Sequence, residues 1–171
     1  MIKTVANPML PEKRTRKVAS EARWCRTGAG RAAEADVLGA LSRGEESDIA
    51  KLASSQLRAK IANYRAQDVE KQLHDPVLFV TLPYVVQLLV ECQCRCHYCE
   101  RDMRVLYETV RDPAQWTLDR VLNARGHNTD NVIAACLACN LRRKTTHHDR
   151  YLSGKQLKWT KRGAEELSVP K

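Results

Sequence analysis

Two pairs of cysteines carry the clearest chemical signal in this sequence. Cys96 pairs with Cys99, and Cys136 pairs with Cys139, with two residues between the members of each pair. That gap lets both thiolates of a pair face one ion, and two pairs complete a tetrahedral four-sulfur shell. Such a shell leaves no position open for water, so it is typical of a structural ion. We therefore predict a structural Zn²⁺ held by these four residues; the alternative is two separate reduced thiol pairs, one of them redox-active.

The chain has seven cysteines, and its other features favour metal binding over disulfides. Residues 1–20 lack the apolar core of a secretory signal, and the longest apolar stretch, 77–90, is interrupted by proline and polar residues. Disulfides are rare in reducing compartments. We expect an intracellular protein of the cytoplasm or nucleus, neither secreted nor inserted in a membrane.

Positive charge is concentrated at the two ends of the sequence. The 171 residues carry a net charge of +9, with eight Lys and Arg against two Glu in residues 1–31, and nine against three acidic residues in 142–171. Basic segments of this kind bind polyanions, because each contact with a phosphate releases counterions. We expect nucleic-acid contacts from six side chains of the C-terminal part: Arg142, Arg143, Lys144, Lys158, Lys161 and Arg162.

Helical patterns occupy the first half of the chain. Residues 32–41 favour a weak helix, and apolar residues recur at helical spacing over 48–73, where Ser47 can act as N-cap. Thr81 followed by Pro83 predicts the start of a short buried helix over 83–91. We expect four parts: a flexible basic arm over 1–20, a helical region over 21–91, a zinc-bound domain over 92–150 and a basic extension over 151–171.

The zinc-bound part has the pattern of two short strands and a helix. Residues 118–121 alternate apolar and charged side chains, which indicates a strand with one buried face, and 132–134 form a second apolar run. Residues 124–130 between them are rich in Gly, Asn and Asp, as in turns. A helix should begin near Cys136. The chain is therefore expected to be α+β, with a helical N-terminal region before a small zinc-stabilised strand–loop–strand–helix unit.

This unit resembles a known enzyme family. The segment LDRVLNARGHNTDNVIAACLACNLRRK, preceded by CHYC, is similar to the zinc-bearing branch of the HNH (ββα-metal, His-Me finger) endonucleases found in phages and large DNA viruses. The resemblance covers residues 96–144, under a third of the chain. It implies a ββα-metal domain that hydrolyses DNA phosphodiester bonds with Mg²⁺ or Mn²⁺.

The resemblance also implies roles for particular residues. Asp119 and Asn140 match the ligands of the catalytic cation, and Asn131 matches the asparagine that holds the loop in shape. Arg120 stands where the family has its general-base histidine, so it would bind phosphate instead. His127, in the loop between the strands, is the best candidate base; His147 and His148 are weaker candidates. Considered singly, Asp119 could instead form a salt bridge, and Asn140 could cap the helix.

Three functional hypotheses follow. The first is a Mg²⁺- or Mn²⁺-dependent HNH endonuclease, homing-type or junction-resolving, that acts on duplex or branched DNA; cutting both strands would indicate a homodimer. The second is a zinc-knuckle DNA-binding protein that does not cut, because Arg120 replaces the base. The third, an RNA-binding knuckle protein, is weaker because the sequence lacks interleaved aromatic residues for base stacking.

Overall fold

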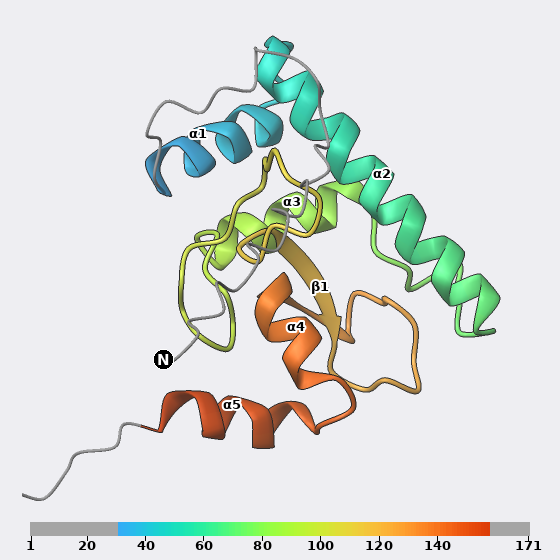
Figure 1. The fold of residues 1–171 in the computed structure, drawn as a ribbon. Coiled ribbons are helices and arrows are strands. Elements are labelled where there is room, and N and C mark those ends of the chain that lie inside the picture. The colour runs from blue at the N-terminus through green and yellow to red at the C-terminus, as the bar shows by residue number, and fades with distance from the viewer. Residues whose placement is uncertain (1–30, 158–171) are drawn as a thin grey trace, which may run out of the picture.

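The computed structural model describes residues 31–157, which form five helices and one two-stranded antiparallel sheet. In Figure 1, the helices formed by residues 31–42, 48–70 and 82–91 lie on one side of the labelled strand, and the two C-terminal helices lie on the other. This part of the chain is α+β, as the sequence predicts. The predicted arm over 1–20 and the side chains of Lys158, Lys161 and Arg162 lie outside the described residues. In chain order the elements are α1 (Arg31–Ser42), α2 (Asp48–Glu70), α3 (Leu82–Glu91), β1 (Trp116–Arg120), β2 (Val132–Cys136), α4 (Leu137–Arg143) and α5 (His148–Gln156).

The N-terminal helices begin where the sequence predicts. The side chain of Ser47 accepts a hydrogen bond from the backbone N–H of Ala50 and caps α2, and Thr81 caps α3 by accepting from Tyr84 N–H. Each cap satisfies a backbone donor that the helix itself leaves unpaired. Among residues 31–157, no helix has the length and apolarity needed to cross a bilayer.

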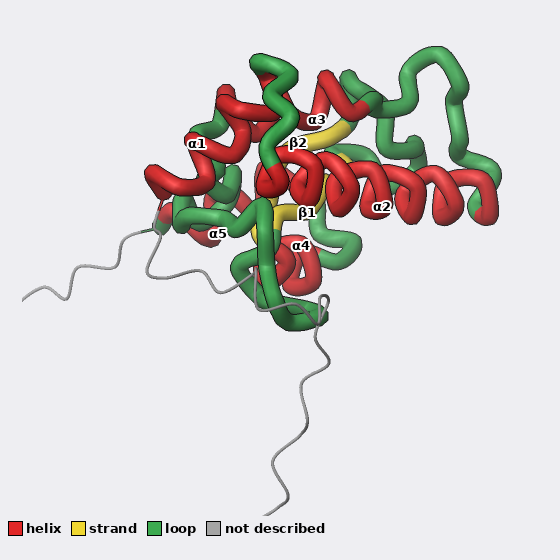
Figure 2. Tube along the Cα trace, turned by 90° about the horizontal axis from the view of Figure 1, so that it is seen from above, coloured by secondary structure: helices red, strands yellow, loops and turns green. Residues whose placement is uncertain are grey.

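One hydrophobic core joins the helices to the strands. Leu57 of α2 and Leu89 of α3 belong to the same buried cluster as Trp116 and Leu118 of β1 and the cysteines at 96, 136 and 139. Seen from above in Figure 2, α2 runs along the molecule beside the strands. The hydroxyl of its Tyr64 accepts a 3.0 Å hydrogen bond from Leu118 N–H. The domain boundary expected at residue 91 therefore lies within a single core.

Strands β1 and β2 are buried on both faces. Their register pairs Trp116 with Cys136 and Asp119 with Ile133, and Thr117, between them, is 4% exposed. Asp119 itself is only 3% exposed. The prediction that the charged side of this strand faces solvent is wrong, because helices pack on both sides of the hairpin. A charged group placed there needs a partner inside the protein.

The C-terminal helix α5 was not predicted from the sequence. It spans residue 150, where we expected a boundary, and has no buried residue of its own. Helix propensity and apolar periodicity are weak in this segment, so its position depends on a few contacts. The ring of Tyr151 meets the ring of Tyr98 edge-on, with centroids 4.9 Å apart, and Leu152 packs against the core.

Gly126 supplies a test of how closely the loop after β1 packs against α2. A Cβ at this position would meet the backbone oxygen of Leu73 and lie 2.9 Å from Asp68 Oδ2. We expect Gly126→Ala to lower the free energy of unfolding in urea by about 1–3 kcal/mol, because the packed surroundings must shift. Gly154→Ala is the matched control, since nothing lies within 4 Å of its Cβ and it sits in a helix. That variant should be about 0.5–1 kcal/mol more stable; equal effects of the two changes would contradict the packing argument.

Candidate functional site

The four predicted cysteines come together in one cluster. The Sγ atoms of Cys96, Cys99, Cys136 and Cys139 all lie within 4.8 Å of one another, and those of Cys99 and Cys136 are 3.9 Å apart. With Zn–S bonds near 2.3 Å, a tetrahedral site separates its sulfurs by about 3.8 Å. The cluster therefore fits a Zn²⁺ ion in both donor chemistry and spacing, whereas Cys92 and Cys94 are not part of it.

Two backbone turns position the cysteines. In the first knuckle, residues 96–99, the backbone N–H of Cys96 donates to Arg101 O and that of Glu100 donates to Cys96 O, both at 2.9 Å. In the second, Cys136 ends β2 and is the N-cap residue of α4, so Cys139 follows in its first turn. His97 N–H donates to Ala134 O of β2 and joins the first knuckle to the sheet.

The crowded sulfurs are electrostatically suited to a cation. Burial, followed by the charge of Cys96, raises the pKa of Cys139 to about 11. The pKa of Cys136 is also raised, chiefly by its hydrogen bond with Cys96 and by burial. Four thiolates would repel one another without a compensating charge. A bound Zn²⁺ supplies that charge and displaces the protons, so its binding is coupled to folding.

Asp119 is held by a buried arginine. Arg143 Nε donates to Asp119 Oδ2 at 2.6 Å, and Nη2 donates to Oδ1 at 2.7 Å. The two side chains are 4% and 2% exposed. The same guanidinium donates to Arg120 O, to Asn123 Oδ1 and to Thr146 O. Of the two roles considered for Asp119, the structure therefore displays the salt bridge.

Tyr98 joins this ion pair to the cysteine cluster. It lies between Cys96 and Cys99, is fully buried, and donates its hydroxyl proton to Asp119 Oδ2 at 2.7 Å. Burial, then the hydrogen bond to Asp119, raises the pKa of the Tyr98 phenol. The first knuckle fixes the position of Tyr98. A change in the cysteine cluster would therefore also disturb the hydrogen bond to Asp119.

The two asparagines make backbone contacts. Asn140 Nδ2 donates to Thr117 Oγ1 and Leu118 O, so it holds α4 against β1 and does not cap the helix. Asn131 accepts from Leu122 N–H and donates to Leu122 O and Gly126 O. These three bonds close the loop between the strands.

His127 pairs with an aspartate from a distant part of the sequence. Its Nδ1 lies 2.8 Å from Asp68 Oδ1, and its backbone N–H donates to Asp68 Oδ2 at 2.6 Å. The ring stacks on Tyr64 with centroids 4.4 Å apart and is 5% exposed. Burial lowers the pKa of His127 although Asp68 opposes the shift, and the positive charge of Arg120 lowers it further. Burial therefore disfavours protonation of the imidazole, and Asp68 orients the ring.

The residues expected to bind Mg²⁺ or Mn²⁺ do not form an open cation site. Both oxygens of Asp119 accept hydrogen bonds from Arg143, whose positive charge repels a second cation at that carboxylate. Asn140 directs its amide nitrogen, not its oxygen, toward β1. Mg²⁺ requires oxygen ligands with room for several waters. In this conformation the described residues do not fit the expected catalytic metal.

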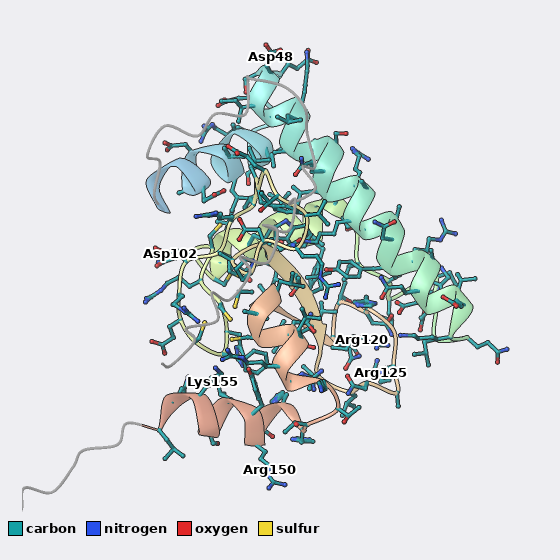
Figure 3. All side chains as sticks on the ribbon, in the orientation of Figure 1. Asp48, Asp102, Arg120, Arg125, Arg150 and Lys155 are labelled. Carbon is teal, nitrogen blue, oxygen red and sulfur yellow. The ribbon has the colours of Figure 1, made fainter. Side chains whose placement is uncertain are left out.

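The residues predicted to contact nucleic acid differ in their exposure to solvent. Arg142 and Lys144 are exposed at the end of α4, but Arg143 between them is buried. The expectation that Arg143 binds nucleic acid is therefore wrong for this structure, because Asp119 and three backbone or amide oxygens use its donors. Arg120 is half-buried, with one weak bond to Arg125 O at 3.3 Å. In Figure 3, Arg120 lies at the end of β1, Arg125 lies on the loop that follows, and Arg150 projects from α5.

Asp68 and Tyr98 were overlooked in the sequence. Asp68 follows Leu57, Ile61 and Tyr64 along the buried stripe of α2, so an acidic residue at the next apolar position was the available signal. Tyr98 had no comparable signal, because its position within a knuckle does not say which way its ring points.

Comparisons of the chain with protein-family models, curated protein sequences and solved structures gave no significant match. The site must therefore be interpreted from its own chemistry.

Removal of zinc should unfold the hydrophobic core to which the cysteine cluster belongs. We expect one tightly bound Zn²⁺ per chain by metal analysis, and loss of the cooperative thermal transition when a strong chelator removes it, because metal binding and folding are coupled. Cys139→Ser should lose the ion. Cys92→Ser, which changes a cysteine outside the cluster, should retain it; equal zinc loss in both variants would contradict the assignment.

The ion pair should be important for stability. Arg143→Ala leaves the buried Asp119 carboxylate without its counter-charge, so we expect a loss of about 3–5 kcal/mol in urea unfolding. Arg142→Ala, on the exposed neighbour, should change stability by less than about 0.5 kcal/mol. The charge-free double variant D119L/R143M should lose less than Arg143→Ala alone. A loss for Arg143→Ala no larger than that for Arg142→Ala would show that the pair contributes little.

His127 should make stability depend on pH. Its folded-state pKa is lowered, so below the unfolded value of about 6.5 the unfolded chain binds a proton that the folded chain resists. The contribution of His127 is fully present above that pH and declines as the pH falls. We expect the difference in unfolding free energy between wild type and His127→Asn to shrink between pH 7.5 and 5.5. A difference that is constant or grows on acidification would contradict the lowered pKa.

Proposed function

We propose that this protein is a zinc-stabilised DNA-binding protein whose strand–loop–strand–helix unit contacts the phosphate backbone and does not cut it. The observation that carries this proposal is the buried Asp119–Arg143 pair. It occupies the carboxylate that an HNH-type endonuclease would use for its cation. A unit with a neutralised carboxylate and no open cation site retains the means to bind but not the expected means to cleave.

The charge distribution supports DNA as the partner. Arg142, Lys144 and Arg150 are exposed on α4, on the turn after it and on α5. They belong to the C-terminal segment in which basic residues outnumber acidic ones by nine to three. Lys and Arg on one surface attract nucleic acid through its backbone, with an affinity that falls as salt rises.

The aromatic residues favour duplex over single-stranded ligands. Within residues 31–157 every Phe, Tyr and Trp side chain is buried or half-buried. Proteins that bind single strands stack successive bases on exposed aromatic rings. Contacts to a double-stranded backbone require no such rings.

An endonuclease is the second candidate, and the His127–Asp68 pair favours it. Asp68 lies at Nδ1 of His127, an arrangement in which Nε2 of the unprotonated ring would be the proton acceptor, and the charge of Arg120 lowers the pKa of the ring. An oriented neutral histidine is a common general base. With His127 only 5% exposed, the loop over 121–130 would have to open before a substrate reached it.

DNA binding can be measured with a matched pair of charge variants. We expect salt-sensitive binding of wild type to duplex DNA, and R142A/K144A should reduce the slope of log K against log salt by about 0.9 for each phosphate contact removed. The control R58A/R65A removes two exposed arginines from α2 and should leave the slope unchanged. Equal losses for both pairs would mean that binding depends on net charge and not on this surface. Stronger binding to single-stranded RNA than to duplex DNA would also overturn the proposal.

Cleavage is tested separately on supercoiled plasmid and branched DNA. We expect no nicking with Mg²⁺, Mn²⁺ or EDTA. Nicking by wild type that is lost in His127→Asn, with zinc content and fold retained, would replace the binding proposal by the endonuclease. Asp119→Asn is the parallel variant: loss of nicking in it would implicate the carboxylate, and the sensitivity to EDTA would show whether a cation is needed.

A further inference from the structure

A second group of metal-ligating side chains lies at the start of α5. His147, His148 and Asp149 each offer a ligand atom, and these atoms lie within 4.8 Å of one another. Nδ1 of His147 is 3.5 Å, and Nδ1 of His148 2.9 Å, from the two carboxylate oxygens of Asp149. The His148 nitrogen is shielded from solvent and lacks hydrogen-bond geometry toward any partner. The ligand atoms of the three side chains therefore lie close together, and Nδ1 of His148 has no hydrogen-bond partner.

A third histidine, from another part of the chain, lies next to this group. The ring of His97, an exposed residue of the first knuckle, has its centroid 6.2 Å from that of His148. The rings of His147 and His148 are 5.6 Å apart. With Zn–N bonds near 2.1 Å, two imidazoles on one tetrahedral ion have centroids about 5.2 Å apart. The separation of His147 and His148 is close to this value. That of His97 and His148 exceeds it by about 1 Å, so the exposed His97 ring would have to move toward His148 to reach the same ion.

We propose that His97, His147, His148 and Asp149 form a second metal site, which binds one Zn²⁺ ion. Three imidazoles and one carboxylate are ligands of zinc and related transition metals, whereas Mg²⁺ and Ca²⁺ prefer oxygen. His147 and Asp149 are exposed, so an ion can reach the site from solvent. This inference does not depend on DNA binding.

The second site would attach α5 to the zinc knuckle. Helix α5 has no buried residue and meets the body through Tyr151 and Leu152. The Tyr151 ring lies on Tyr98, and its hydroxyl is buried beside Cys139. An ion shared by His97 and the start of α5 adds a link between the same two elements. The positive end of the helix dipole opposes a cation there, so this site binds zinc more weakly than the cysteine cluster.

The experiment counts the zinc ions and then identifies the ligands of the weaker one. Wild type is dialysed against a weak chelator, so that only the cysteine-bound ion remains, and is titrated with Zn²⁺ by calorimetry. We expect one further equivalent. His148→Ala should abolish it, and His97→Ala should weaken it by about tenfold or more, since even residues that only support ligands contribute this much. His74→Ala is the control, because His74 packs against Phe79 away from the cluster and should leave the titration unchanged.

Cobalt distinguishes the two sites by their ligands. Co²⁺ added to the protein with one Zn²⁺ should give visible d–d bands without the sulfur-to-metal charge-transfer absorption of a thiolate site. A single equivalent of zinc in wild type would overturn the proposal, as would a second equivalent that survives His148→Ala. A charge-transfer band would assign the second ion to cysteines and also overturn it. An unchanged affinity in His97→Ala would refute the four-ligand site.

Discussion

The buried ion pair between Asp119 and Arg143 holds five segments of this chain together. Asp119 belongs to β1 and accepts from Tyr98 of the first knuckle, while Arg143 ends α4 and donates to the loop after β1 and to the turn before α5. Two charges removed from water require each other, because either one alone would be destabilising. The pair therefore fixes the relative positions of the knuckle, the strand and the last two helices.

The cysteine cluster and the ion pair depend on each other through Tyr98. Zinc at the four sulfurs would fix the first knuckle, and the knuckle places the Tyr98 hydroxyl on Asp119. On the other side of the hairpin, Asp68 and Tyr64 of α2 hold His127, and Tyr64 also accepts from the backbone of β1. The polar side chains of the hairpin thus find hydrogen-bond partners on both of its faces. This explains how charged and amide side chains can be buried between helices.

The same contacts determine which chemistry is available. Arg143 neutralises the carboxylate that the resemblance to HNH endonucleases assigns to a catalytic cation, and Asn140 donates to the backbone of β1. Positive charge remains exposed at Arg142 and Lys144, on either side of the buried arginine. These exposed side chains are the ones to which we assign the proposed phosphate contacts, whereas the buried Arg143 has a structural role.

The sequence by itself determined the local features. The spacing of Cys96, Cys99, Cys136 and Cys139 predicted their cluster, and the capping residues Ser47 and Thr81 predicted where α2 and α3 begin, because these signals act over a few residues. Only the tertiary structure decided the partners of Asp119 and His127, which come from 24 and 59 residues away. It also decided that Arg143 is buried and that α5 forms a helix across residue 150. Burial and charge pairing depend on which elements pack together, and residue spacing along the chain does not encode that.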